Sequence, residues 1–188
     1  MEEISLSLVR HLPTDWNEAG KLQGRADRSI LDPSVRKQLA AVDDDVEKVF
    51  CSSLQRTGQT ASVFGFGERV EINPDLDEWD FGEWEGRQKA DLATLPEWRE
   101  APDQLKMGEP FGDLTARVAR FYRGLCEADE RSVLVFGHGA WIRCFLAIFR
   151  SGNPLEMNLV EVQNGEANRV QLRSPADHFA TYFDSVSK

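Results

Sequence analysis

The chain has 188 residues, of which 41% are hydrophobic and 29% are charged, the balance of an ordinary globular protein. Its formal net charge of −10 excludes a typical nucleic-acid or anionic-membrane binder, since those partners attract basic proteins. Three widely spaced cysteines form no CxxC pair and indicate neither a zinc ribbon nor a disulfide framework. An acidic start and short apolar runs give no sign of a signal peptide or a membrane span. We therefore expect a cytoplasmic protein that binds neither nucleic acid nor membrane, of unknown oligomeric state.

The pattern of apolar residues predicts alternating strands and helices within one domain over residues 1–188. We expect strands at 4–9, 46–51, 69–72 and 132–136, and helices at 33–42, 54–64, 111–126 and 139–149. This order favours a three-layer α/β/α sandwich with a mostly parallel mixed sheet. Segments 159–162 and 169–172 flank Asn164-Gly165 and predict a terminal hairpin. Residues 74–112 interrupt the rhythm, and we expect them to form an insertion over the active site.

Three polar clusters follow predicted strands, namely Arg10-His11, Ser52 to Arg56, and Gly137 to Gly139. Ligands of open α/β sheets bind at the carboxyl ends of the strands, so we expect these clusters to meet. The forked guanidinium groups of Arg10 and Arg56 are suited to binding a phosphate. The N-terminus of the helix predicted after His138 also favours an anion. A neutral imidazole can attack phosphorus, and a cationic one beside it would stabilise the transferring oxygens. Any single histidine here could be structural, and only the joint placement favours a site. No HxH or HExxH spacing supports a metal.

Five segments resemble, in order, the motifs of the histidine phosphatase superfamily, the phosphoglycerate-mutase-like group. They are residues 8–11 with Thr14, Asn17 and 23–27, then 51–61, 76–86, 108–117 and 135–143. The resemblance implies an α/β/α sandwich and requires no metal or organic cofactor.

The resemblance also implies site residues. His11 is the implied nucleophile, which becomes a phosphohistidine, and Glu78 is the implied general acid and then base. Three further residues complete the implied phosphate pocket, namely Arg10, Arg56 and His138. Asn17 is expected to bind a phosphate oxygen or to hold the loop that carries the nucleophile. Thr14, Gln23 and Gly139 are expected to lie beside the pocket. Rival acids crowd the segment of Glu78, namely Asp77, Asp80, Glu83 and Glu85.

The motif departs from the family pattern directly after the nucleophile. Leu12 and Pro13 stand where the family has Gly and often Glu. The Leu12 side chain could narrow the pocket, redirect the loop or fill an apolar gap behind it. Pro13 stiffens the loop. We expect activity to survive because every chemical group remains.

The function expected from these features is hydrolysis of a small soluble phosphate monoester through His11. The alternatives are phosphoglycerate mutase-type phosphoryl transfer and a catalytically weak phosphate-binding regulatory protein. Segment 74–112 holds four basic residues against eleven acidic ones, which disfavours a tightly held bisphosphate.

Overall fold

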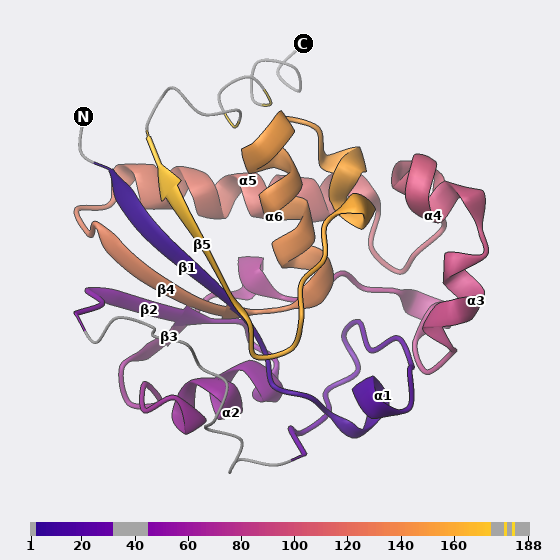
Figure 1. The fold of residues 1–188 in the computed structure, drawn as a ribbon, viewed down its shortest axis with the longest axis horizontal. Helices are drawn as coiled ribbons and strands as arrows, with labels where there is room; N and C mark the ends of the chain where they lie inside the picture. Colours follow the sequence, from indigo (N-terminus) through magenta and orange to yellow (C-terminus); the bar gives the residue numbers. More distant parts are fainter. Residues whose placement is uncertain (1–2, 32–44, 174–178, 180–181, 183–188) are drawn as a thin grey trace.

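The computed structural model describes residues 3–31, 45–173, 179 and 182, and the helix predicted at 33–42 lies outside these residues. A five-stranded sheet has the order β3-β2-β4-β1-β5 (Figure 1). Its strands are β1 (Ile4–Arg10), β2 (Lys48–Cys51), β3 (Val70–Ile72), β4 (Ser132–Gly137) and β5 (Ala167–Leu172). All neighbours run parallel except β1 and β5, which are antiparallel.

Helices cover both faces of this sheet. Helices α5 (Phe111–Glu127) and α6 (Gly139–Ser151) lie on one side, and α2 (Gln55–Val63) lies on the other (Figure 1). Strand β4 is buried on both faces, because Val133 and Val135 pack toward α5 and α6 while Leu134 and Phe136 pack toward α2. The structure confirms the predicted α/β/α sandwich with a mostly parallel sheet.

The predicted terminal hairpin is wrong. Residues Pro154–Leu159 form the 3₁₀ helix η5, and no strand follows at 160–162. Backbone partners explain the difference: Arg10 Nη1 donates to the Val162 carbonyl, and Gly165 N–H donates to the Arg10 carbonyl. The segment therefore crosses the end of β1, and β5 pairs with β1 instead. Gly165 makes this turn at φ +74°, where other residues are strained.

The segment over residues 74–112 consists of short helices joined by loops. These are η2 (Pro74–Leu76), η3 (Gly82–Trp84), α3 (Lys89–Ala93), α4 (Pro96–Glu100) and η4 (Pro102–Gln104). Together with α1 (Asp15–Glu18), α3 and α4 lie beyond the carboxyl ends of the parallel strands (Figure 1). Fully buried Trp79 packs against Trp98 and Phe111 and anchors the segment. Its role as a lid stays a prediction.

Within the described residues, no helix combines the length and the apolar character that crossing a membrane requires.

Candidate active site

The parallel register brings two of the predicted clusters to one point. Arg10 pairs with Gly137, and the next residue, His11, donates its backbone N–H to the Gly137 carbonyl at 2.9 Å. The rings of His11 and His138 consequently lie 5.3 Å apart. Ser52, which follows β2, reaches the same place and contacts His138 through its hydroxyl.

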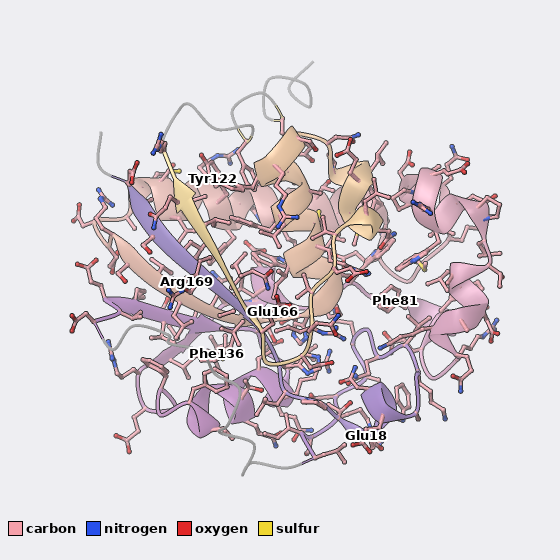
Figure 2. The ribbon with its side chains drawn as sticks, viewed as in Figure 1. Glu18, Phe81, Tyr122, Phe136, Glu166 and Arg169 are labelled. Atoms are coloured by element: carbon pink, nitrogen blue, oxygen red, sulfur yellow. The ribbon has the colours of Figure 1, made fainter. Side chains whose placement is uncertain are left out.

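A cavity of about 400 Å³ opens at this edge of the sheet. Seven of the predicted site residues line it: Arg10, His11, Asn17, Gln23, Arg56, Glu78 and Gly139. Phe81, on the side where α3 lies, also lines the cavity (Figure 2). Among the described residues, five buried side-chain polar atoms lack a partner, and four of them belong to this wall: Arg10 Nε, Gln23 Oε1, Arg143 Nε and Asn158 Oδ1. Buried polar atoms are normally hydrogen-bonded, so this wall suits a polar ligand.

His11 has the protonation state that a nucleophile needs. Its Nδ1 lies 2.7 Å from the Leu12 carbonyl, which can only accept, so the proton sits on Nδ1 and Nε2 keeps its lone pair. Burial, together with the neighbouring Arg56 and Arg10 guanidinium groups, lowers the pKa of His11 well below 6.5. The ring is therefore neutral at physiological pH, with Nε2 unprotonated.

Two arginines supply the positive charge of the cavity. Arg56 is fully buried and donates to His138 Nδ1 at 3.2 Å, to the Gly24 carbonyl at 2.7 Å and to the Ala26 carbonyl at 2.9 Å. These bonds use three of its five N–H groups, which leaves two for a ligand. Arg10 packs against Gly139, where an added Cβ would lie 3.3 Å from its guanidinium carbon. A glycine at 139 therefore leaves room for this arginine.

The structure corrects the prediction of a cationic histidine beside the nucleophile. His138 accepts from Arg56 at Nδ1, so its proton is on Nε2, which donates to Ser52 Oγ at 2.7 Å. Burial and the nearby Arg56 lower its pKa well below 6.5. His138 is fully buried and is not among the residues that line the cavity. Its place suits the positioning of Arg56 rather than direct contact with a ligand.

Glu78 occupies the start of α6, where the sequence predicts a bound phosphate. Its carboxylate accepts from the backbone N–H groups of Ala140 and Trp141, each at 3.1 Å, and from that of Trp79 at 3.0 Å. Glu78 thus uses two of the helix N–H groups expected to favour an anion, and binding of phosphate at this helix start stays a prediction. The same contacts hold the carboxylate on the cavity wall.

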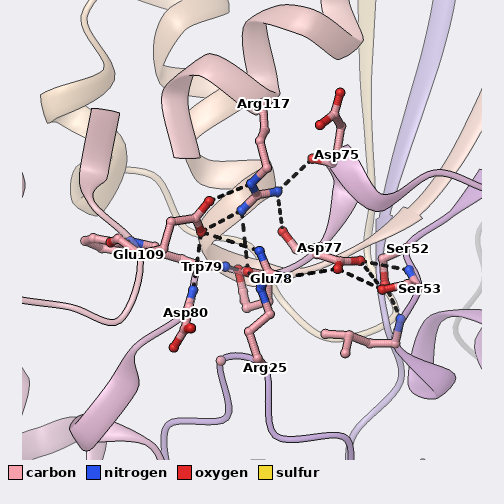
Figure 3. Close-up of polar contacts among 12 residues, drawn as sticks. Arg25, Ser52, Ser53, Asp75, Asp77, Glu78, Trp79, Asp80, Glu109 and Arg117 are labelled. Carbon is pink, nitrogen blue, oxygen red and sulfur yellow. Dashed lines mark hydrogen bonds and ion pairs between the residues drawn. The ribbon is translucent and has the colours of Figure 1, made fainter. Parts of the chain in front are cut away.

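An ion-pair network holds the loop that carries Glu78 (Figure 3). Arg117 of α5 binds both carboxylate oxygens of Glu109, at 2.7 and 2.8 Å, and donates to the carbonyls of Asp75 and Asp77 at 2.8 Å. Arg25 donates from Nε to the Glu78 carbonyl at 3.0 Å. Two arginines from distant parts of the chain thus fix the backbone before the acid and at the acid itself.

Three of the four rival carboxylates have other partners. Asp77 accepts from Ser53, Glu85 accepts from the backbone of Arg25 and Ala26, and Asp80 accepts from Gly82. None of the rivals lines the cavity, whose acidic lining residues are Glu78 and the exposed Glu161. The geometry therefore favours Glu78.

Thr14 and Asn17 form the cap of α1. Thr14 is fully buried, and its backbone N–H and hydroxyl both donate to Asn17 Oδ1. Of the two, only Asn17 lines the cavity. The structure thus favours holding the loop after His11, one of the two roles expected of Asn17.

Comparison with known proteins identifies the family. A model of the histidine phosphatase superfamily, branch 1, matches residues 6–185. The chain belongs to this superfamily. Among superfamily relatives, it is 30% identical to a Proteus mirabilis protein named probable phosphoglycerate mutase GpmB, covering 91% of this chain and 86% of that one. It is 31% identical to the adenosylcobalamin/alpha-ribazole phosphatase of Salmonella typhimurium, covering 77% and 78%. The crystal structure of TTHB049 from Thermus thermophilus matches with a TM-score of 0.69 and 29% identity, covering 89% and 93%.

The residue that departs from the superfamily pattern, Leu12, is buried beside Gly165. It is 4% exposed, and its Cδ2 would lie 3.2 Å from a Cβ added at Gly165. Its backbone N–H donates to Thr60 Oγ1 at 2.9 Å. Leu12 is not among the residues that line the cavity, so its side chain does not narrow the site.

Sequence reasoning missed three basic residues of the wall, Lys21, Lys89 and Arg143. Arg143 stands four positions after Gly139 in a mostly apolar helix. Residues at that spacing share a helix face, so an arginine one turn after the predicted helix start was an available signal.

Proposed function

We propose that this member of the superfamily hydrolyses a small phosphate monoester through a phosphohistidine on His11. The observation that carries the proposal is the neutral His11, which keeps Nε2 unprotonated and lines a cavity together with Arg10 and Arg56. Neutral imidazole is a competent nucleophile, and two guanidinium groups stabilise charge on the phosphoryl oxygens.

In the first step His11 Nε2 forms a bond to phosphorus while the bond from phosphorus to the ester oxygen breaks. The departing oxygen takes the proton of the neutral Glu78 carboxyl group and leaves as an alcohol. Arg10 and the two remaining N–H groups of Arg56 hold the nonbridging oxygens.

In the second step water attacks the phosphohistidine. Glu78, now a carboxylate, accepts the proton of that water, and the bond between nitrogen and phosphorus breaks. Inorganic phosphate leaves, His11 regains its lone pair, and Glu78 is again protonated. The three backbone donors to Glu78 stabilise it as the carboxylate between these steps.

The alternative is transfer of the phosphoryl group to a second alcohol. A mutase-named relative and a phosphatase-named relative are similarly close to this chain, so their names do not separate the two reactions. The basic residues Lys21, Lys89 and Arg143 make the cavity more cationic than segment 74–112 alone suggests. This feature supports keeping a mutase-type reaction as the second candidate.

The deciding experiment is a single-turnover reaction with an aryl phosphate, quenched without acid and analysed by mass spectrometry. We expect the phosphoryl group on His11 and its loss in His11→Ala, while His138→Ala still forms the phosphoenzyme at a reduced rate. A phosphoryl group on Cys51, Ser52 or Ser53 would refute the mechanism. Phosphate binding without any turnover would indicate a regulatory protein, and transfer to an added alcohol in place of water would indicate a mutase.

Metal independence is a further part of the proposal. Guanidinium groups already neutralise the phosphate, so turnover should persist in EDTA and be inhibited by vanadate or orthophosphate. Complete loss in EDTA with recovery on adding Mg²⁺ or Zn²⁺ would overturn this part of the mechanism.

A further inference from the structure

Glu85 is a half-buried carboxylate that the proposed chemistry does not use. It directly follows η3 and is not among the residues that line the cavity. Its two carboxylate oxygens accept from the backbone N–H groups of Arg25 and Ala26, at 2.7 and 3.0 Å. Glu85 therefore binds segment 74–112 to the loop that follows the nucleophile.

Arg56 binds the same stretch of backbone through its carbonyl groups. Its Nη2 donates to the Gly24 carbonyl at 2.7 Å, and its Nη1 donates to the Ala26 carbonyl at 2.9 Å. The Gly24 carbonyl and the Arg25 N–H belong to one peptide unit, which is planar, so in the usual trans form they point in opposite directions. Glu85 and Arg56 consequently bind the two ends of a single peptide. A rotation of that peptide would break both hydrogen bonds at once.

Gly24 has the backbone conformation and the open space that this arrangement requires. Its φ of +52° is one that residues with a side chain rarely adopt. A Cβ added at Gly24 would lie 2.8 Å from Glu85 Cδ, so a side chain would collide with the carboxylate. The glycine thus permits the close approach of Glu85, independently of the hydrogen bonds that Glu85 accepts.

On the basis of the proposed function, we propose that Glu85 is a positioning residue for the phosphoryl group and acts through Arg56. By fixing the peptide between Gly24 and Arg25, Glu85 keeps N–H groups of Arg56 on backbone carbonyls and directs the two remaining N–H groups to the phosphoryl oxygens. Without this carboxylate the peptide is free to turn, and Arg56 loses the partner that sets its direction.

The charge of Glu85 by itself predicts the opposite effect on ligand binding. Burial lowers the pKa of Arg56, and nearby carboxylates that include Glu85 raise it. Removing one of these negative charges leaves the cavity more positive, which should strengthen the binding of an anion. The sign of the change in affinity therefore separates positioning from charge.

The test measures orthophosphate binding by titration calorimetry, which gives the competent fraction of the protein and the Kd separately. We expect Glu85→Ala to raise the Kd by about 10- to 100-fold, the range of hydrogen bonds to a charged group. Glu85→Gln keeps one acceptor oxygen and should weaken binding less. Gly24→Ala displaces the carboxylate without removing its charge and should also weaken binding. The matched control is Glu83→Gln, an exposed carboxylate of η3, which should keep the wild-type Kd.

Two further measurements assign the effect to Arg56. Single-turnover transfer from alkyl and aryl phosphates should slow equally in Glu85→Ala, because Arg56 binds phosphoryl oxygens that both substrates share, whereas Glu78 protonates the departing oxygen. In an Arg56→Lys background, Glu85→Ala should add little further loss of orthophosphate affinity.

An unchanged or lower Kd in both Glu85 variants would overturn the inference, as would a transfer loss confined to alkyl phosphates or fully additive losses with Arg56→Lys. A variant that is only less stable would bind fewer equivalents of orthophosphate at an unchanged Kd, which would also overturn it. Absence of a phosphoryl group on His11 in the wild type refutes the proposed function instead.

Discussion

Replacing Arg117 by methionine should cost about 3–5 kcal/mol of folding free energy. The side chains of Arg117 and Glu109 are only 9% and 11% exposed, so their pair belongs to the buried class, for which removal of one partner has this cost. Methionine keeps most of the apolar volume but leaves the Glu109 carboxylate with only the longer ion pair to Arg25, at 3.7 Å, among the described residues. It also removes the donors to the carbonyls of Asp75 and Asp77, beside the loop of Glu78.

The loss is a large part of the roughly 5–15 kcal/mol that stabilises a typical domain. At roughly 2–4 °C per kcal/mol for a chain of this size, the melting temperature should fall by about 6–20 °C. Arg120→Met is the matched control, since Arg120 lies on the same helix and pairs with Asp75 at 2.7 Å, but with side chains 53% and 28% exposed. Exposed pairs contribute about 0–1 kcal/mol, so this variant should melt close to the wild type.

Urea unfolding of both variants, with midpoint and slope fitted separately, measures the difference. Removing the stranded charge with Glu109→Gln in the Arg117→Met background should recover part of the loss, and the double-mutant cycle gives the coupling energy. A cost for Arg117→Met below about 1 kcal/mol, or one equal to that of Arg120→Met, would refute the reasoning that this pair is buried and strong.

His11 and His138 have folded-state pKa values well below 6.5, so below about pH 6.5 the unfolded chain binds protons that the folded chain does not. Stability in urea should therefore fall from about pH 7.5 to about pH 5.5, at up to about 1.4 kcal/mol per pH unit for each ring, and a flat profile would contradict the lowered values. Glu78→Gln should slow phosphoryl transfer from alkyl phosphates by about 10²–10⁴-fold in single turnover and slow nitrophenyl phosphate much less. Equal losses would leave Glu78 only a positioning role. Leu12→Gly should destabilise the fold by about 2–5 kcal/mol, whereas Leu12→Met should cost less than about 1.5 kcal/mol, and equal thermal unfolding of the two would show that the side chain fills no gap.

The strands and helices themselves were predictable because their signals are local. The Val-Leu-Val-Phe run of β4 predicts burial on both faces, and apolar spacings of three and four predict α5. The motif order also placed His11, Arg56 and Glu78 among the cavity residues. The strands and helices depend on neighbours within one turn or one strand, so residue order alone encodes them, whereas the three site residues were implied by the resemblance.

Tertiary structure decided the rest, because it depends on contacts between residues far apart in the sequence. Pairing of β5 with β1 replaced the predicted hairpin, since the end of β1 binds the segment before β5. Glu78 took the helix N–H groups expected for phosphate, across a separation of 62 residues to Ala140. The neutral state of His138 and the lowered pKa of Arg143 likewise depend on which groups burial brings beside them, because desolvation and neighbouring charge act through space and not along the chain.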